Sequence, residues 1–418
     1  MVLTGRVSPA PEGLWNRRAK PMNFIDHARQ AREVEVVGLL EAVCQSLEPT
    51  SSQTSLAKQR YEGVGTWLAK SDDPVLRSIT VYLQGSTAIG TVVRPIGFNE
   101  FDVDLVAHVP DLDVQLSPAA QKKALGDRLR ANGNYVSLLE EMARCWRLNY
   151  AGEFHMDITP SIPNPKCRFG GELVPDKALK RWNPSNPKGY RRMFEERAKL
   201  VPVIRIRKHI AADSLGANVE PYPQAIAFKG ILRRIVQIAK RHRDTLFIDR
   251  MDVAPLSVII TTLASRSYEW CVRNREYDNE LELVLDVIQH MPDSIDTCEV
   301  DGVLQWFIWN ETTAGENFAE KWNQRPERAE RFYTWHARFC ANIAALPTIR
   351  GIDRLGEKLT DLFGQKPASE AIGKIVDRVS DARTTGNLRV APKVGLTVTA
   401  AAAAAGSTPV RSNTFFGS

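Results

Sequence analysis

The chain has 418 residues, of which 43% are hydrophobic and 25% are charged. These values are ordinary for a soluble globular protein, and the length is enough for two domains and a large core without disulfides or structural metals. The net charge of +6 suits polyanionic ligands such as triphosphates, but so small an excess does not by itself indicate a nucleic-acid-binding protein.

The sequence also predicts where the protein resides. The six cysteines lie far apart and form no metal-binding spacing, so we expect reduced thiols. The N-terminus lacks the apolar segment of a signal peptide, and no run reaches the roughly 20 apolar residues of a membrane span. We therefore expect a cytoplasmic protein without membrane association.

The first half of the chain predicts helices and strands in mixed order. Apolar residues at helical spacing predict helices at 24–46, 52–70 and 117–146, the last with a break at 132–134. Alternating or β-branched runs predict strands at 78–83, 101–109, 147–151 and 154–159. This order indicates an α/β or α+β lobe around a short sheet. Residues 160–189, rich in Pro, Asn, Gly and Lys, predict a long surface loop.

The second half predicts mainly helices, at 224–243, 255–273, 280–290, 318–346 and 352–363. A low-complexity tail follows from about residue 391 and predicts disorder. The chain is thus expected to have an irregular N-terminus at 1–20, a first lobe at 21–190, a helical lobe at 191–385 and a disordered tail at 386–418.

The strand expected at 101–109 carries two acidic residues. Because alternate side chains on a strand share a face, Asp102 and Asp104 point one way while Val103 and Leu105 point toward a core. Two carboxylates so close repel each other unless a cation lies between them, and Mg²⁺ prefers oxygen ligands. A lone Asp-x-Asp pattern is usually a solvated strand face, but the apolar opposite face favours a functional site at a defined rim.

Two weaker motifs lie on either side of that strand. Gly85-Ser86 follows the strand at 78–83, and a glycine lets backbone amides approach a phosphate. Asp157 alternates with Met156 on the strand at 154–159, so it completes a cluster of three carboxylates if the two strands are neighbours. Alone, these motifs would be an ordinary turn and an edge-strand acid, but their order along the chain is the one that a two-metal site requires.

The runs LQGSTAIGT, NEFDVDL and FHMDI resemble those of the DNA polymerase β nucleotidyltransferases. More narrowly, they resemble the bacterial CD-NTases, the relatives of cyclic GMP–AMP synthase in CBASS antiphage defence. The resemblance implies an α+β, two-lobed fold with a small mixed sheet and a mainly helical second lobe. It implies two bound Mg²⁺ ions, with Mn²⁺ as an alternative, held by the catalytic residues Asp102, Asp104 and Asp157. It also implies a triphosphate held at Gln84, Gly85 and Ser86.

The resemblance extends into the second half through the runs VQIAKRHRD, PLSVIITTL and NFAEKW. It implies that Lys240 and Ser257 reach the triphosphate from the second lobe and that Asn317 touches a base. Each residue also has an ordinary structural interpretation. Lys240 belongs to a basic helix end, and Ser257 and Asn317 suit helix N-caps.

The implied activity is the joining of nucleoside triphosphates, ATP and GTP, into a cyclic oligonucleotide second messenger. A purine cyclic dinucleotide such as cyclic GMP–AMP is favoured, with a cyclic trinucleotide next and no obligatory nucleic acid. The alternatives are an RNA-tailing or protein-nucleotidylating enzyme on the same scaffold, and a catalytically inactive nucleotide-binding scaffold. Some members of the family act with a ubiquitin-transfer-like partner at the C-terminus, for which Phe416-Gly417-Ser418 would be accessible although the last residue is not glycine.

Overall fold

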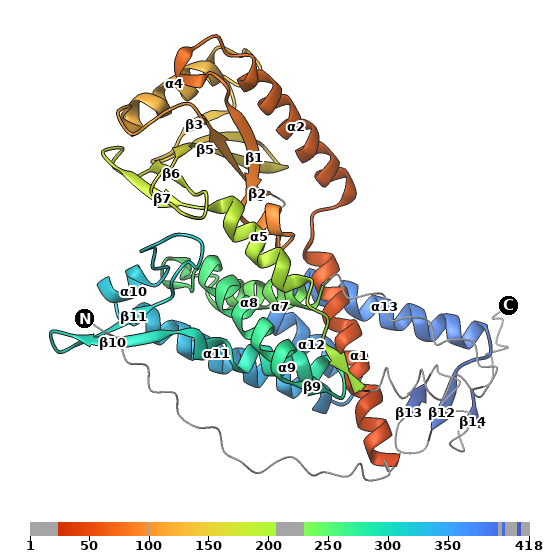
Figure 1. The fold of residues 1–418 in the computed structure, drawn as a ribbon. Coiled ribbons are helices and arrows are strands. Elements are labelled where there is room, and N and C mark those ends of the chain that lie inside the picture. The colour runs from red at the N-terminus through yellow and green to blue at the C-terminus, as the bar shows by residue number, and fades with distance from the viewer. Residues whose placement is uncertain (1–23, 98–99, 206–229, 392–394, 398–407, 411–418) are drawn as a thin grey trace.

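The computed structural model describes residues 24–97, 100–205, 230–391, 395–397 and 408–410, which form a sheet-containing lobe and a helical lobe (Figure 1). The sheet-containing lobe comprises α2 (Ser51–Ala69), β1 (Thr80–Gln84), α3 (Gly85–Ile89), β2 (Phe101–His108), α4 (Pro118–Arg130), β3 (Leu139–Glu141), β4 (Trp146–Tyr150), β5 (Phe154–Pro163), β6 (Glu172–Pro175) and β7 (Trp182–Ser185), with a 3-10 turn at Pro74–Leu76. α5 (Pro187–Ala198) runs between the lobes and contacts both.

The sheet of the first lobe is mixed. Its strand order is β1-β2-β5-β4-β3, and β6 and β7 extend it from β5. β2 and β5 are parallel neighbours, whereas β1 with β2 and β4 with β5 are antiparallel. This sheet, together with a separate helical lobe, confirms the predicted α+β class.

One face of the sheet is covered by helices. Val103, Leu105, Met156 and Ile158 are no more than 1% exposed and pack with apolar residues of α2 and α4. Because side chains alternate along a strand, the residues between them on β2 and β5 lie on the other face, which is polar. The apolar residues of β2 and β5 therefore determine which face of the sheet is covered by helices and which is left uncovered.

The helical lobe has its own core, separate from that of the sheet. Its helices are α1 (Phe24–Leu47), α7 (Ile231–Leu246), α8 (Ser257–Asn274), α9 (Glu280–Gln289), α10 (Glu320–Gln324), α11 (Glu327–Ala345), α12 (Ile352–Phe363) and α13 (Gln365–Thr384), with 3-10 turns at Met251–Val253, Met291–Ser294 and Leu346–Thr348. The short pairs β8 (Val203–Ile204) with β9 (Glu276–Tyr277) and β10 (Asp296–Val300) with β11 (Val303–Phe307) complete it. Most of α7 is buried, so this helix is the centre of the lobe.

Several expectations about secondary structure were wrong. The break predicted at 132–134 is present, but the helix does not resume after it: α4 ends at Arg130, and the Asn132 side chain accepts the Asn134 N–H at 3.0 Å in the turn toward β3. The surface loop predicted at 160–189 instead contains the end of β5, the β6–β7 hairpin and the start of α5. Pro163 and Pro175 end β5 and β6, Pro184 lies on the edge strand β7 and Pro187 begins α5, all positions that tolerate a missing N–H.

Two further differences concern the second half of the chain. The helix predicted at 318–346 is divided into α10 and α11, with Pro326 between them. The tail expected to be disordered contains a small antiparallel sheet of β12 (Arg389–Ala391), β13 (Gly395–Thr397) and β14 (Thr408–Pro409). The C-terminal residues proposed for partner capture, 416–418, lie outside the described residues, as do residues 1–20. Within the described part of the chain, no helix has the length and apolarity that crossing a membrane would require.

A buried ion-pair cluster joins α1 to α7. Arg234, which is 2% exposed, donates to Glu41 Oε1 over 2.6 Å and to Glu48 Oε1 over 2.7 Å. We expect Arg234→Met to lower the free energy of unfolding by about 3–5 kcal/mol, because it leaves buried carboxylates without their cation. Urea unfolding followed by circular dichroism measures this loss.

The matched control is Lys58→Met, which breaks an exposed pair with Glu62 on α2. An exposed pair of this kind contributes at most about 1 kcal/mol, so this variant should unfold nearly as the wild type does. Equal effects of the two substitutions would contradict a stabilising role for the buried cluster.

Candidate active site

Three acidic residues lie on the open face of the sheet. Asp102 and Asp104 are two residues apart on β2, and Asp157 on β5 is the direct neighbour of Asp104 in the parallel register. His155 lies beside Asp102 in the same register. Since the strands are parallel and in contact, the carboxylates of all three acids project from one face. The sequence pattern anticipated the shared face, but only the strand pairing brings Asp157 beside Asp104.

The electrostatics of this cluster favour a cation. Burial, together with the neighbouring charges of Asp102 and Asp157, raises the pKa of Asp104 to about 6, against the opposing effect of Arg147 and Lys240. Desolvation by the surrounding protein also raises the pKa of Asp102, although its side chain stays accessible to solvent. Carboxylates whose charged forms are destabilised in this way gain most from a hard divalent cation, so the donor set fits Mg²⁺.

Arg147 on β4 is a part of this site that the sequence did not reveal. It is the antiparallel neighbour of Asp157, and its Nε and Nη2 donate to the two carboxylate oxygens of Asp157 over 2.6 and 2.8 Å. Its Nη2 also lies 3.8 Å from Asp102 Oδ1. The three acids are accordingly not gathered within 4.8 Å of one another in the described structure. The alternation of Arg147 and Asn149 with the apolar Trp146 and Leu148 is the signal that could have placed this arginine on the polar face.

Gly85 brings the backbone close to Asp104. α3 begins at Gly85, directly after β1, and Gly85 has φ +63°. A Cβ atom at this position would lie 2.5 Å from Asp104 Oδ2. Both the left-handed backbone and the lack of space therefore require glycine here. The Gly85 turn therefore packs directly against Asp104. Because the two residues are far apart in the sequence, the sequence does not suggest this contact.

The helical lobe provides the opposite wall. Lys240 on α7 is 6% exposed, and its Nζ donates to the carbonyl and hydroxyl oxygens of Thr91 over 3.2 and 3.1 Å. Burial and the nearby Arg243 lower the pKa of Lys240 to about 7. Ser257 begins α8, and its hydroxyl accepts a hydrogen bond from Arg243 Nη2 at 3.2 Å. Lys240 and Ser257 thus both lie beside Arg243 on this wall.

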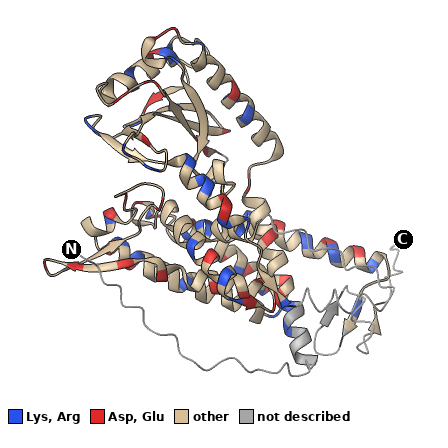
Figure 2. Cartoon of the chain, viewed as in Figure 1, with Lys and Arg blue, Asp and Glu red and all other residues tan. Residues whose placement is uncertain are grey.

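A single cleft of about 700 Å³ joins these walls. Seven of the nine residues singled out from the sequence line it: Gln84, Gly85, Ser86, Asp102, Asp104, Lys240 and Ser257. Figure 2 shows basic residues along α5, at the boundary of the lobes, and Arg191 of this helix also lines the cleft. The volume and the basic side chains suit a nucleoside triphosphate.

The other two candidate residues do not line the cleft. Asp157 lies behind Asp104 and is held by Arg147. The Asn317 side chain is used by the backbone around it, accepting from the Ile308 and Ala319 N–H groups at 2.9 Å and donating to Trp306 O at 3.0 Å. Asn317 thereby holds the loop whose neighbouring residues, Glu316 and Phe318, do line the cleft.

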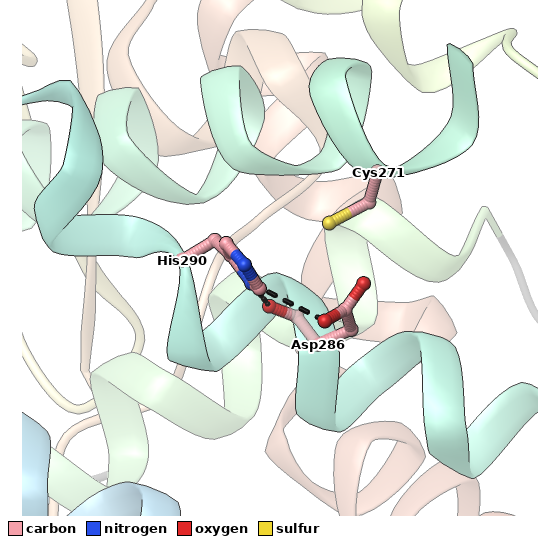
Figure 3. Close-up of side chains that lie close together, drawn as sticks. All are labelled: Cys271, Asp286 and His290. Atoms are coloured by element: carbon pink, nitrogen blue, oxygen red, sulfur yellow. Dashed lines mark hydrogen bonds and ion pairs between the residues drawn. The ribbon is translucent and has the colours of Figure 1, made fainter. Parts of the chain in front are cut away.

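A second cluster of ligand-type side chains lies away from the cleft, between α8 and α9 (Figure 3). Cys271, Asp286 and His290 have ligand atoms within 4.8 Å of one another, the only such group found in the described residues. Arg275 and Tyr277 donate to the two carboxylate oxygens of Asp286, over 2.5 and 2.6 Å. Burial raises the pKa of the Cys271 thiol to about 11. A neutral thiol and a carboxylate already paired with a guanidinium make a structural network rather than a metal site.

Comparison with known proteins agrees with this geometry. Residues 35–197 match the family model of the Second Messenger Oligonucleotide or Dinucleotide Synthetase domain. A c-di-GMP synthase of Roseivirga ehrenbergii is 29% identical over 386 residues, which cover 90% of this chain and 96% of that protein. The cyclic dinucleotide synthase CdnG of Bradyrhizobium diazoefficiens is 28% identical over 227 residues, 50% of this chain and 53% of that protein.

Solved structures show the same fold. The B. diazoefficiens CD-NTase CdnG in complex with GTP superposes with a TM-score of 0.60 at 20% identity, covering 80% of this chain and 97% of that one. CdnC of E. coli MS115-1 with ATP gives a TM-score of 0.56 at 13% identity, covering 80% and 99%. The mixed sheet with its acids facing a helical lobe defines a polymerase β-like nucleotidyltransferase. Within that class, the chain is similar to bacterial CD-NTases, and both curated relatives are named as cyclic dinucleotide synthases.

Proposed function

We propose that this enzyme makes a guanine-containing cyclic dinucleotide, with GTP as a substrate. The observation that carries the proposal is the match to a c-di-GMP synthase along nearly the whole length of both chains. Cyclic di-GMP is therefore the first candidate product. Cyclic GMP–AMP, the product favoured from the sequence and one that also uses ATP, is the second, and a cyclic trinucleotide is the third.

The cleft, together with Asp157 on the strand beside it, provides the groups that this reaction needs. Asp102, Asp104 and Asp157 would hold two Mg²⁺ ions, or Mn²⁺ in their place, which would supply charge neutralisation at the phosphates and a more acidic ribose hydroxyl. Gly85, Ser86 and Lys240 would hold the phosphates. Because the pKa of Lys240 is lowered to about 7, an arriving polyanion would strengthen its protonation and tighten the contact.

The proposed step is in-line attack by a ribose hydroxyl oxygen on the α-phosphorus of a triphosphate. A new P–O bond forms, the bond between the α-phosphorus and its bridging oxygen breaks, and pyrophosphate leaves while the hydroxyl loses its proton. A second step of the same kind closes the ring. The residues of both cleft walls would keep the phosphates in place through the two steps and so favour repeated transfer between bound nucleotides.

Mass spectrometry of the product tests the proposal. The purified protein is incubated with the four nucleoside triphosphates and Mg²⁺, without RNA or a protein acceptor. We expect a cyclic dinucleotide that contains guanine, together with two pyrophosphates for each ring. Product formed only when RNA or protein is added would favour the tailing or nucleotidylating alternative. Triphosphate binding without release of pyrophosphate would favour an inactive scaffold.

A role in CBASS antiphage defence, suggested by the similarity to CD-NTases, forms part of the same proposal. The hypothesis of a ubiquitin-transfer-like partner rests on residues 416–418, for which the described structure offers no support. Synthesis of the cyclic dinucleotide does not depend on such a partner in this scheme.

A further inference from the structure

The cleft wall contains a carboxylate that the reaction scheme does not use. The described lining residues include four acids: Asp102, Asp104, Asp244 and Glu316. The first two belong to the proposed metal-binding set, and Asp244 is paired with Arg243, whose Nε donates to Asp244 Oδ1 over 2.6 Å. The remaining acid, Glu316, is hydrogen-bonded to the neutral side chains of Asn310 and Thr313 rather than paired with a cation. It therefore remains an acceptor that a bound molecule can reach.

The loop at 310–316 fixes the position of this carboxylate. Asn310 Nδ2 donates to Glu316 Oε2 over 2.7 Å, and the Asn310 N–H donates to the Glu316 carbonyl over 2.9 Å. The loop is attached to α5 through Glu311, whose carboxylate oxygens accept from the two terminal nitrogens of Arg197 at 2.8 and 2.9 Å. A second attachment runs from Asn186 Nδ2 to Thr312 O over 2.8 Å. Glu316 is thus held in place before any ligand arrives.

Aromatic side chains line the cleft beside Glu316. Phe318 is two residues away, and its ring meets the Tyr190 ring edge-on with centroids 6.2 Å apart. The Tyr190 hydroxyl is hydrogen-bonded to Thr262 over 2.9 Å, which fixes that ring. An aromatic ring offers a surface for the face of a base, and a carboxylate offers acceptors for its edge. Together they are the two contacts that nucleobase recognition uses.

The chemistry of the carboxylate selects among the bases. An ionised carboxylate only accepts hydrogen bonds and has room for several. The Watson–Crick edge of guanine presents two adjacent donors, N1–H and the N2 amino group, which match the two oxygens of a carboxylate. Adenine presents one donor and one acceptor on the same edge, so its N1 lone pair would face a negative charge. The same carboxylate therefore attracts guanine and disfavours adenine.

We propose that Glu316 selects guanine over adenine at this cleft by accepting hydrogen bonds from the guanine edge, while Phe318 contacts the face of the base. This inference rests on the proposed use of GTP and names the residue responsible for it. Asn310 acts as a positioning residue, since it orients the carboxylate without meeting the base.

The test is Glu316→Gln, measured at pH 8. Burial raises the pKa of Glu316, so the comparison is made at a pH well above the usual range of a carboxyl group. Glutamine retains an oxygen that can accept from Asn310, but it replaces the other acceptor with a donor, which matches adenine. We expect the ratio of kcat/KM for GTP to that for ATP to fall by about tenfold or more, as for loss of a bidentate base contact. Glu320→Gln, an exposed acid on α10, is the matched control and should leave the ratio unchanged.

Calorimetric titration with GTP and with ATP gives a second measurement that does not depend on turnover. The Glu316→Gln variant should lose its higher affinity for GTP than for ATP. The Glu316→Asp variant should bind GTP more weakly than the wild type does, but still more tightly than it binds ATP. If Glu316→Gln still makes cyclic product and its ratio of kcat/KM for GTP to that for ATP is unchanged, the inference is overturned. The proposed function would remain intact. Absence of product from the wild type would refute the proposed function, and the titrations would still decide whether Glu316 selects guanine.

Discussion

The Asp104→Asn variant is expected to lose cyclic dinucleotide synthesis by about a hundredfold or more, since removing a ligand from a two-metal site removes several kcal/mol of stabilisation. Asp104 is the central acid, with Asp102 two residues away on its strand and Asp157 beside it on the next. Production of pyrophosphate and of the cyclic product measures the loss. Asp111→Asn, which removes an exposed charge from the same lobe, is the control and should remain active.

The same variant should not be less stable than the wild type. The folded-state pKa of Asp104 is raised to about 6 from an ordinary value of 3.8. Between these values the folded protein holds a proton that the unfolded chain has lost, so ionising Asp104 costs stability as the pH rises through this window. Without metal at pH 7.5, Asp104→Asn should melt at the same temperature as the wild type or higher, and the difference should shrink at pH 5.

These two measurements separate chemistry from folding. Synthesis close to the wild-type rate would refute the assignment of Asp104 to the metal-binding set. A large drop in melting temperature at both pH values would instead indicate that the acid is needed for the fold.

Gly85→Ala is expected to reduce synthesis by about a hundredfold. A methyl group at this position would lie 2.5 Å from Asp104 Oδ2, and φ +63° is unfavourable for alanine. The chain can relieve the contact only by moving the turn or the carboxylate, and a displacement of about 1 Å in a reacting group can cost about a hundredfold in rate. Steady-state kinetics and thermal melting on the same preparation measure both effects.

Gly152→Ala provides the matched control for this prediction. Gly152 also has a positive φ, +77°, but a Cβ atom there would meet nothing within 4 Å. It therefore carries the backbone strain, about 1 kcal/mol, without the contact at the acid. We expect Gly152→Ala to be slightly less stable and nearly fully active. If Gly85→Ala were equally active, the close packing of the turn against Asp104 would have no part in catalysis.

Asp157 is paired with Arg147, whereas the carboxylate of Asp102 is accessible. This difference affects how divalent cations would bind at the site. Arg147 holds both oxygens of Asp157, while the side chain of Asp102 is 61% exposed. The guanidinium supplies positive charge to the acid cluster in the described structure. A divalent cation that uses Asp157 would have to share this carboxylate with Arg147 or displace it, whereas Asp102 is accessible from the cleft.

The sequence by itself determined the local half of the site. The alternation in FDVDL and FHMDI puts Asp102, Asp104 and Asp157 on the polar faces of their strands, because side chains alternate along any strand whatever its partners. The helices at 24–46 and 352–363 and the strands on either side of Gly85 were predicted for the same reason: their patterns repeat over a few residues. Where the pattern was interrupted by prolines and asparagines, at 160–189, the local signal was wrong.

The tertiary structure alone decided which strands and walls meet. Parallel pairing of β2 with β5 brings Asp157 to Asp104, and pairing of β4 with β5 brings Arg147 to Asp157. The approach of α7 and of the loop at 310–316 adds Lys240 and Glu316 to the cleft. Such contacts join residues from 10 to more than 200 positions apart in the chain. They depend on the burial of whole faces against one another, so no short stretch of sequence carries their pattern.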